Sequence, residues 1–130
     1  MASVTLKGYK VDKIDFVAML DNGTQVKLAH KYQYNVQYAK NNVCKGEFDI
    51  EVYDSSNPDK FKVHVTMSGI FAFAEGEKKE RIHTDTFKAL FPYVKAFITT
   101  ITANCGIPPI IIPDIDIDNQ QIYRIDNNLQ

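Results

Sequence analysis

The sequence lacks most of the residues that would build a metal site, a nucleotide site or a disulfide framework. It has no tryptophan, two cysteines and three histidines, and its six glycines are scattered instead of gathered in a phosphate-binding loop. Cys44 and Cys105 lie far apart and outside zinc-ligand spacing, so we expect two buried free thiols in a reducing compartment. No segment has the pattern of a signal peptide or the length to span a bilayer. A cytoplasmic protein without membrane insertion is therefore expected.

The polar residues form no recognisable catalytic arrangement. The three histidines match no HExxH pattern and have no cysteine or carboxylate at ligand spacing. Asp114, Asp116 and Asp118 alternate as in a calcium loop, but the glycine and closing glutamate of that loop are missing, which favours a solvated strand edge. A net charge of −1 without a basic cluster gives no reason to expect nucleic acid. We predict a protein that is not an enzyme and needs neither cofactor nor metal.

The first half of the sequence is built from alternating apolar and polar residues. Residues 31–38 have a strict period of two, and runs at 46–53 and 61–68 repeat it. Turn-forming residues at 54–59 predict an antiparallel return between those two runs. An earlier strand at about 5–20 ends at the turn sequence Asp21-Asn22-Gly23. These runs predict a four-stranded, mostly antiparallel sheet with one apolar face and one polar face, and His64 falls on the polar face.

The second half changes to the spacing of a helix. Apolar residues recur at steps of three and four, at Phe87, Leu90, Phe91, Val94, Phe97, Ile98 and Ile101. Pro92 lies within this stripe, so the helix either restarts there or kinks, and Gly106 is placed to end it. A polar tail from about residue 119 has room for a short helix near 119–125. We predict a single α+β domain over residues 1–130, with C-terminal helices packed on one face of the four-stranded antiparallel sheet.

Between the helix and the tail lies an apolar segment, "CGIPPIIIPD", that cannot form a helix or a central strand. Its three prolines lack an N–H, hold φ at about −65° and keep the preceding residue extended. An extended backbone points Ile110 and Ile112 to one side and Ile111 to the other. Two roles remain open. The isoleucines either line a binding groove, with Ile110 and Ile112 only partly buried, or seal the open end of the core.

Three segments, in order, carry a resemblance to a known family. They are "SGIFAFAEGE" at 68–77, "LFPYVKAFITTI" at 90–101 and "GIPPIIIPDIDID" at 106–118. Behind four predicted strands, they resemble the last strand, the helix start and the proline-framed extended segment of the bacterial secretion chaperone SecB. The resemblance implies a four-stranded antiparallel sheet packed by helices, usually in a dimer of dimers. It also implies an ATP-independent holdase that keeps non-native polypeptides unfolded in long hydrophobic grooves.

The resemblance also nominates residues for such a groove. Aromatic faces bury much area at low entropic cost, which suits promiscuous binding. The implied client-binding residues are Phe71, Phe73, Phe91, Tyr93, Phe97, Ile110 and Ile112. The expected partners are non-native polypeptide clients and further copies of this chain, in a dimer or tetramer.

The sequence departs from the family pattern where the export partner binds. In the export chaperones, acidic residues on the exposed sheet face help to dock the ATPase SecA. Lys13, Val17 and His64 stand at the corresponding positions, and none of them is acidic. We therefore expect weak or no SecA binding. The alternatives are a dedicated SecB-like chaperone of a toxin–antitoxin system, a non-catalytic adaptor for one specific partner, and a small-molecule binding domain.

Overall fold

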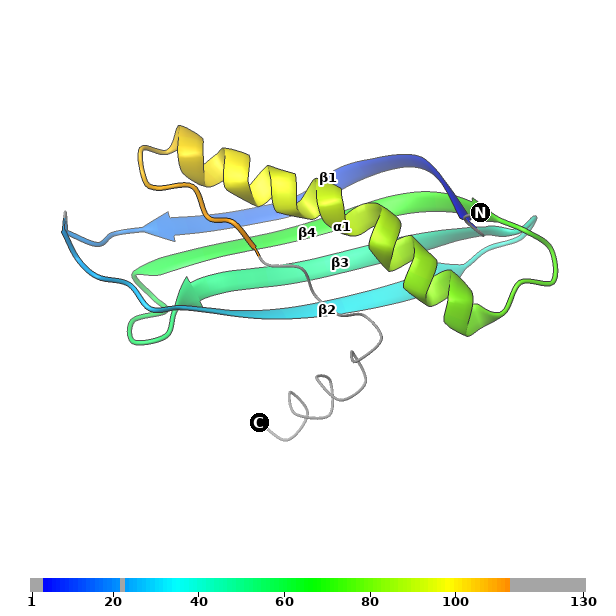
Figure 1. The fold of residues 1–130 in the computed structure, drawn as a ribbon, viewed down its shortest axis with the longest axis horizontal. Coiled ribbons are helices and arrows are strands. Elements are labelled where there is room, and N and C mark those ends of the chain that lie inside the picture. Colours follow the sequence, from blue (N-terminus) through cyan, green and yellow to red (C-terminus); the bar gives the residue numbers. More distant parts are fainter. Residues whose placement is uncertain (1–3, 22, 113–130) are drawn as a thin grey trace.

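The computed structural model describes residues 4–21 and 23–112, and in that part of the chain a single helix covers one face of a sheet (Figure 1). The sheet has the order β1-β4-β3-β2, and every neighbouring pair is antiparallel. The elements are β1 (Val4–Ala18), β2 (Leu28–Tyr38), β3 (Val43–Asp54), β4 (Phe61–Phe73) and α1 (Lys79–Asn104). The predicted α+β fold is confirmed. The Asp114–Asp118 alternation and the short helix expected near 119–125 lie outside the described residues.

The two faces of the sheet differ as the alternation predicted. On the face beneath α1, Phe48 and Ile50 of β3 and Val63 and Val65 of β4 have no exposed area. On the opposite face the neighbouring positions are polar, and His64 is among them. Because successive side chains of a strand point to opposite faces, the period of two in the sequence was sufficient to assign these residues to the two faces of the sheet.

Helix α1 is longer than the apolar stripe that predicted it. It begins at Lys79, well before Phe87, and continues through Pro92 without restarting. The proline is exposed on the solvent side of the helix, where its missing N–H costs one backbone hydrogen bond but no core contact. Towards the sheet the helix buries Ile82, Thr86, Phe87, Leu90, Phe91, Val94, Ile98 and Thr102.

Aromatic rings join α1 to the sheet. The ring of Phe48 lies 5.2 Å from that of Phe87 and 5.5 Å from that of Phe91. Tyr34 of β2 is buried beside them, and its hydroxyl donates a hydrogen bond to Thr86 Oγ1. Burial raises the pKa of Tyr34 well above its usual range, because a phenolate would lose its hydration there. The Tyr34 hydroxyl is therefore paired within the core, and Thr86 passes the hydrogen bond on by donating to the Ile82 carbonyl oxygen at 2.8 Å.

The two cysteines have different environments. Cys44 is buried in β3, and burial raises the pKa of its thiol. Cys105 is exposed, so the prediction of two buried thiols is wrong for this residue. The reason is its position: Cys105 is the C-cap of α1 and lies beyond Thr102, the last residue that the helix buries.

Candidate functional site

The proline-rich segment at residues 106–112 follows α1 and runs back across the helical face of the sheet (Figure 1); we call it the strap. Gly106 has φ of +80°, a left-handed conformation that glycine adopts without strain, and it reverses the chain after the helix. Ile110 attaches the strap to α1 at two points. Its N–H donates to Thr102 Oγ1 at 2.9 Å, and its carbonyl oxygen accepts from Thr99 Oγ1 at 2.7 Å.

The isoleucine run of the strap alternates as predicted, but its burial differs from the groove expectation. Ile111 is 78% exposed, whereas Ile110 is 9% and Ile112 is 2% exposed. The expectation that Ile110 and Ile112 are only partly buried is therefore wrong. The hydrogen bonds at Ile110 hold the strap against α1, so these two side chains join the core and seal it.

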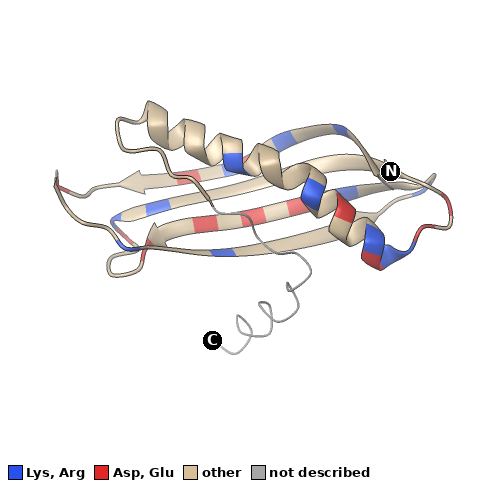
Figure 2. Cartoon of the chain, viewed as in Figure 1, with Lys and Arg blue, Asp and Glu red and all other residues tan. Residues whose placement is uncertain are grey.

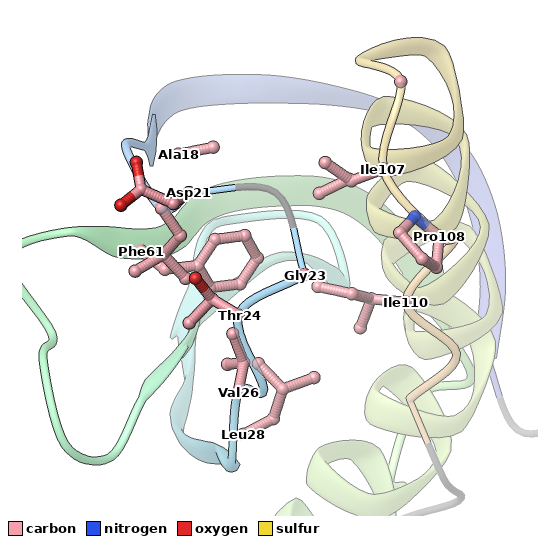
Figure 3. Close-up of a pocket in the computed structure, with 12 residues that line it drawn as sticks. Ala18, Asp21, Gly23, Thr24, Val26, Leu28, Phe61, Ile107, Pro108 and Ile110 are labelled. Atoms are coloured by element: carbon pink, nitrogen blue, oxygen red, sulfur yellow. The ribbon is translucent and has the colours of Figure 1, made fainter.

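A pocket of about 540 Å³ lies between the strap and the connection from β1 to β2 (Figure 3). We call it the strap pocket. Ile107, Pro108 and Ile110 line it on the strap side, and the facing wall contains Ala18, Leu20, Val26, Leu28 and Phe61. Asp21 is the one charged residue among the described lining residues, and its carboxylate points away from the strap (Figure 3). The volume falls within the range of about 300–1,000 Å³ that is typical of ligand pockets.

The strap pocket is suited to binding apolar groups. Aliphatic side chains, one proline and one phenylalanine form most of its wall, so an apolar group that enters it leaves water. The wall that the β1–β2 connection supplies was not predicted from the sequence, because this stretch was interpreted only as a turn. The apolar residues on both sides of Asp21-Asn22-Gly23 were the available indication that the connection packs against something.

Three of the predicted groove residues lie in or beside the core. Phe71 has no exposed area and Phe91 is 6% exposed, so neither offers much surface to a client. Phe73 is half-buried at the end of β4, where its ring lies 6.1 Å from that of Tyr38. This end of β4 is opposite to the end at Phe61, which lines the strap pocket.

Tyr93 and Phe97 lie on the flank of α1 that faces β1. The ring of Tyr93 is 4.5 Å from that of Tyr9, and these side chains are 42% and 50% exposed. Ile14, also on the helical face of β1, is 51% exposed. We call Tyr9, Ile14 and Tyr93 the β1-flank patch. The strap runs along the other flank of α1 (Figure 1), so the predicted site residues divide between the core and separate surfaces.

The strands of the sheet carry charged residues of both signs (Figure 2), and the strand register places Lys62, Asp15 and Asp49 on the polar face. Lys13, Val17 and His64 all lie on this face, as the strand register requires. His64 has a polar partner on this face, because its Nε2 lies 2.8 Å from Asp49 Oδ1. Thr66 donates to the other oxygen of the same carboxylate at 3.0 Å. Glu51 and Asp15 of this face form ion pairs with Lys31 and Lys62, so three of its carboxylates are already engaged.

Within residues 4–21 and 23–112, α1 is too polar to serve as a membrane-spanning helix. No group of three or more His, Cys, Asp or Glu side chains is arranged there to hold a metal ion.

Comparisons with known proteins place the chain in a family. A family model described as "Preprotein translocase subunit SecB" matches residues 11–128. "Uncharacterized protein MJ0357" of Methanocaldococcus jannaschii is 28% identical over 124 residues, which cover 88% of this chain and 80% of that protein. The solved structure "Mycobacterium tuberculosis Rv1957 SecB-like chaperone in complex with a ChAD peptide from Rv1956 HigA1 antitoxin" is 10% identical, with a TM-score of 0.66 over 88% of this chain and 91% of that one. At this identity the structural likeness shows the fold. Because the family model spans most of the sequence, the chain belongs to the SecB family.

Proposed function

We propose that this protein is an ATP-independent chaperone that holds non-native polypeptides in the cytoplasm, with the strap pocket as an anchoring site for one apolar client side chain. The observation that carries the proposal is an open apolar pocket with one rigid, proline-framed wall in a member of the SecB family. Such a protein needs no reaction. It acts by mass action, because it lowers the free concentration of an unfolded chain without altering the folded one.

The size of the strap pocket limits what it contributes alone. Burying one large apolar side chain is worth about 1.5–3 kcal/mol, whereas a Kd of about 1 μM needs about 8 kcal/mol. A client must therefore contact several surfaces at once. Phe97 and the β1-flank patch, or the pockets of further copies of the chain, would supply the remaining contacts through multivalent binding.

Aggregation assays on several unrelated denatured proteins test this proposal. We expect the wild type to suppress aggregation and Leu28→Asp to lose most of that effect, because Leu28 lines the strap pocket. Leu28 is 45% exposed, so the new charge should cost little folding stability. Gln25→Asp is the matched control: it adds the same charge three residues earlier, in the β1–β2 connection, at an exposed residue that does not line the pocket.

The outcomes separate the candidate functions. If Leu28→Asp and the wild type suppress aggregation equally, the strap pocket does not take part in client binding. A wild type that suppresses the aggregation of none of the proteins would favour an adaptor with one specific partner. A thermal shift with one particular compound would instead favour a small-molecule binder.

A dedicated role in a toxin–antitoxin system is the second candidate. The observation that favours it over export is the polar face, where Lys13, Val17 and His64 occupy the positions expected for acidic docking residues. The structure of Rv1957, which shares the fold, holds a peptide from an antitoxin. We propose weak or no binding to SecA. Tight, salt-sensitive binding in a titration would restore the export role.

A further inference from the structure

We propose that Thr99 and Thr102 are positioning residues that fix one wall of the strap pocket and so determine which size of apolar side chain it accepts. The geometric part of this inference depends only on the described contacts. The part about client side chains rests on the proposed chaperone function.

The strap has few ways to hold itself in place. Pro108 and Pro109 carry no N–H, so neither can donate a backbone hydrogen bond. Ile110 is the first residue after them with a backbone donor. Its N–H and its carbonyl oxygen are both used, and both partners are threonine hydroxyls of α1. Because the strap has so few backbone donors, the two threonine hydroxyls supply a substantial share of the hydrogen bonds that attach it to α1.

The two hydroxyls are well suited to this role. Thr102 is fully buried, and its Oγ1 donates to the Ile98 carbonyl oxygen at 2.9 Å while it accepts from the Ile110 N–H. A hydroxyl has one hydrogen and two lone pairs, so these roles are compatible. Thr99 Oγ1 uses its hydrogen on the Ile110 carbonyl oxygen. Each hydroxyl therefore has a defined partner on the strap.

Fixing Ile110 fixes the wall of the strap pocket. Proline restricts its own φ and keeps the preceding residue extended, so the stretch from Ile107 to Ile110 behaves as a short stiff rod. One end of this rod follows Gly106, whose left-handed backbone places it at a turn, and the other end is held by the threonines. Ile107, Pro108 and Ile110 all face the pocket (Figure 3). Without the hydroxyls, the wall could move relative to Phe61 and Leu28 opposite.

The test compares Thr→Val with Thr→Ser at each position. Valine keeps the shape of threonine and removes the hydroxyl, whereas serine keeps the hydroxyl. Without any client, hydrogen exchange at the Ile110 amide should rise at least tenfold in Thr99→Val and Thr102→Val and stay near wild type in the serine variants. Since Thr102 is fully buried, Thr99→Val keeps the test valid if Thr102→Val does not fold.

A second measurement addresses selectivity. Extended fluorescent peptides that differ only in one anchor residue, leucine or tryptophan, are titrated against each variant. In the wild type the two peptides should differ in Kd. In the valine variants we expect the ratio of the two Kd values to move at least threefold closer to one, and in the serine variants we expect the wild-type ratio. Unchanged exchange at Ile110, or an unchanged ratio despite faster exchange, would overturn the proposal. If exchange rises as expected but the wild type binds no peptide and holds no client, the positioning role stands and the chaperone function fails.

Discussion

At the scale of the residue, Gly46 shows how closely the core is packed around Tyr34. A Cβ at position 46 would meet the Tyr34 hydroxyl oxygen, and Phe71 Cε1 would be 3.2 Å away. The Tyr34 ring cannot easily move aside, because its hydroxyl is bonded to Thr86. We predict that Gly46→Ala lowers the free energy of unfolding by about 1–3 kcal/mol, as overpacking does in other cores. Urea denaturation measures this change.

The double variant Gly46→Ala/Tyr34→Phe identifies the atom responsible. Phenylalanine removes the oxygen that the new methyl group would meet, and the nearest remaining ring atom is then 3.0 Å away. The alanine should therefore cost less in the Tyr34→Phe background than in the wild type. Equal costs in the two backgrounds would show that the Tyr34 oxygen is not the obstacle.

Tyr34 also predicts a pH dependence at the alkaline end. Burial raises the pKa of its hydroxyl in the folded state above the usual value of about 10. The stability that this raised pKa contributes is complete below pH 10 and is lost as pH rises towards the folded value, since only the unfolded state releases the proton there. Denaturation curves from about pH 9 upward should thus show a steeper loss of stability in the wild type than in Tyr34→Phe. Parallel losses would contradict this assignment.

At the scale of the element, the strap offers a matched pair of substitutions. Ile112 is buried and Ile111 is exposed, although they are neighbours in one extended segment. We predict that Ile112→Asp lowers the free energy of unfolding by about 3–5 kcal/mol, because it buries an unpaired charge. Ile111→Asp should change it by no more than about 0.5 kcal/mol, as at other exposed sites. Thermal melts of the two variants give the comparison, and similar losses in both would show that the strap does not seal the core in this way.

The elements also show which features a sequence can reveal. Alternation is a local property, so the inward faces of β2, β3 and β4 followed directly from their residues. The start of α1 at Lys79 did not, because its first turns are polar and have no capping side chain. The two threonine hydroxyls that hold Ile110 were also beyond prediction, since they reach 8 and 11 residues along the chain to a segment without secondary structure. The wall of the strap pocket combines β1, β2, β4 and the strap, and no local pattern brings these together.

At the scale of the whole molecule, the exposed apolar side chains predict assembly. The β1-flank patch includes two residues of β1, an edge strand of 15 residues, and such edges are normally covered or protected. We predict at least a dimer at tens of micromolar in sedimentation velocity. Tyr93→Asp, at a residue that is 42% exposed, should shift the population towards monomer without lowering the melting temperature of the fold. A wild-type monomer at that concentration would contradict the prediction.

The strand order has a consequence for how the chain is made. Among the described strands, β1 pairs with β4 alone, from Val4 opposite Phe73 to Ala18 opposite Phe61, so β1 stays unpaired until β4 has been synthesised. Ribosomes add about 5–20 residues per second, so β1 remains without its partner strand for on the order of several seconds. During that interval Val11, Ile14 and Phe16 emerge without the strand they pair with in the finished sheet. A nascent copy of this protein is then itself an extended, partly apolar chain of the kind that a holdase binds.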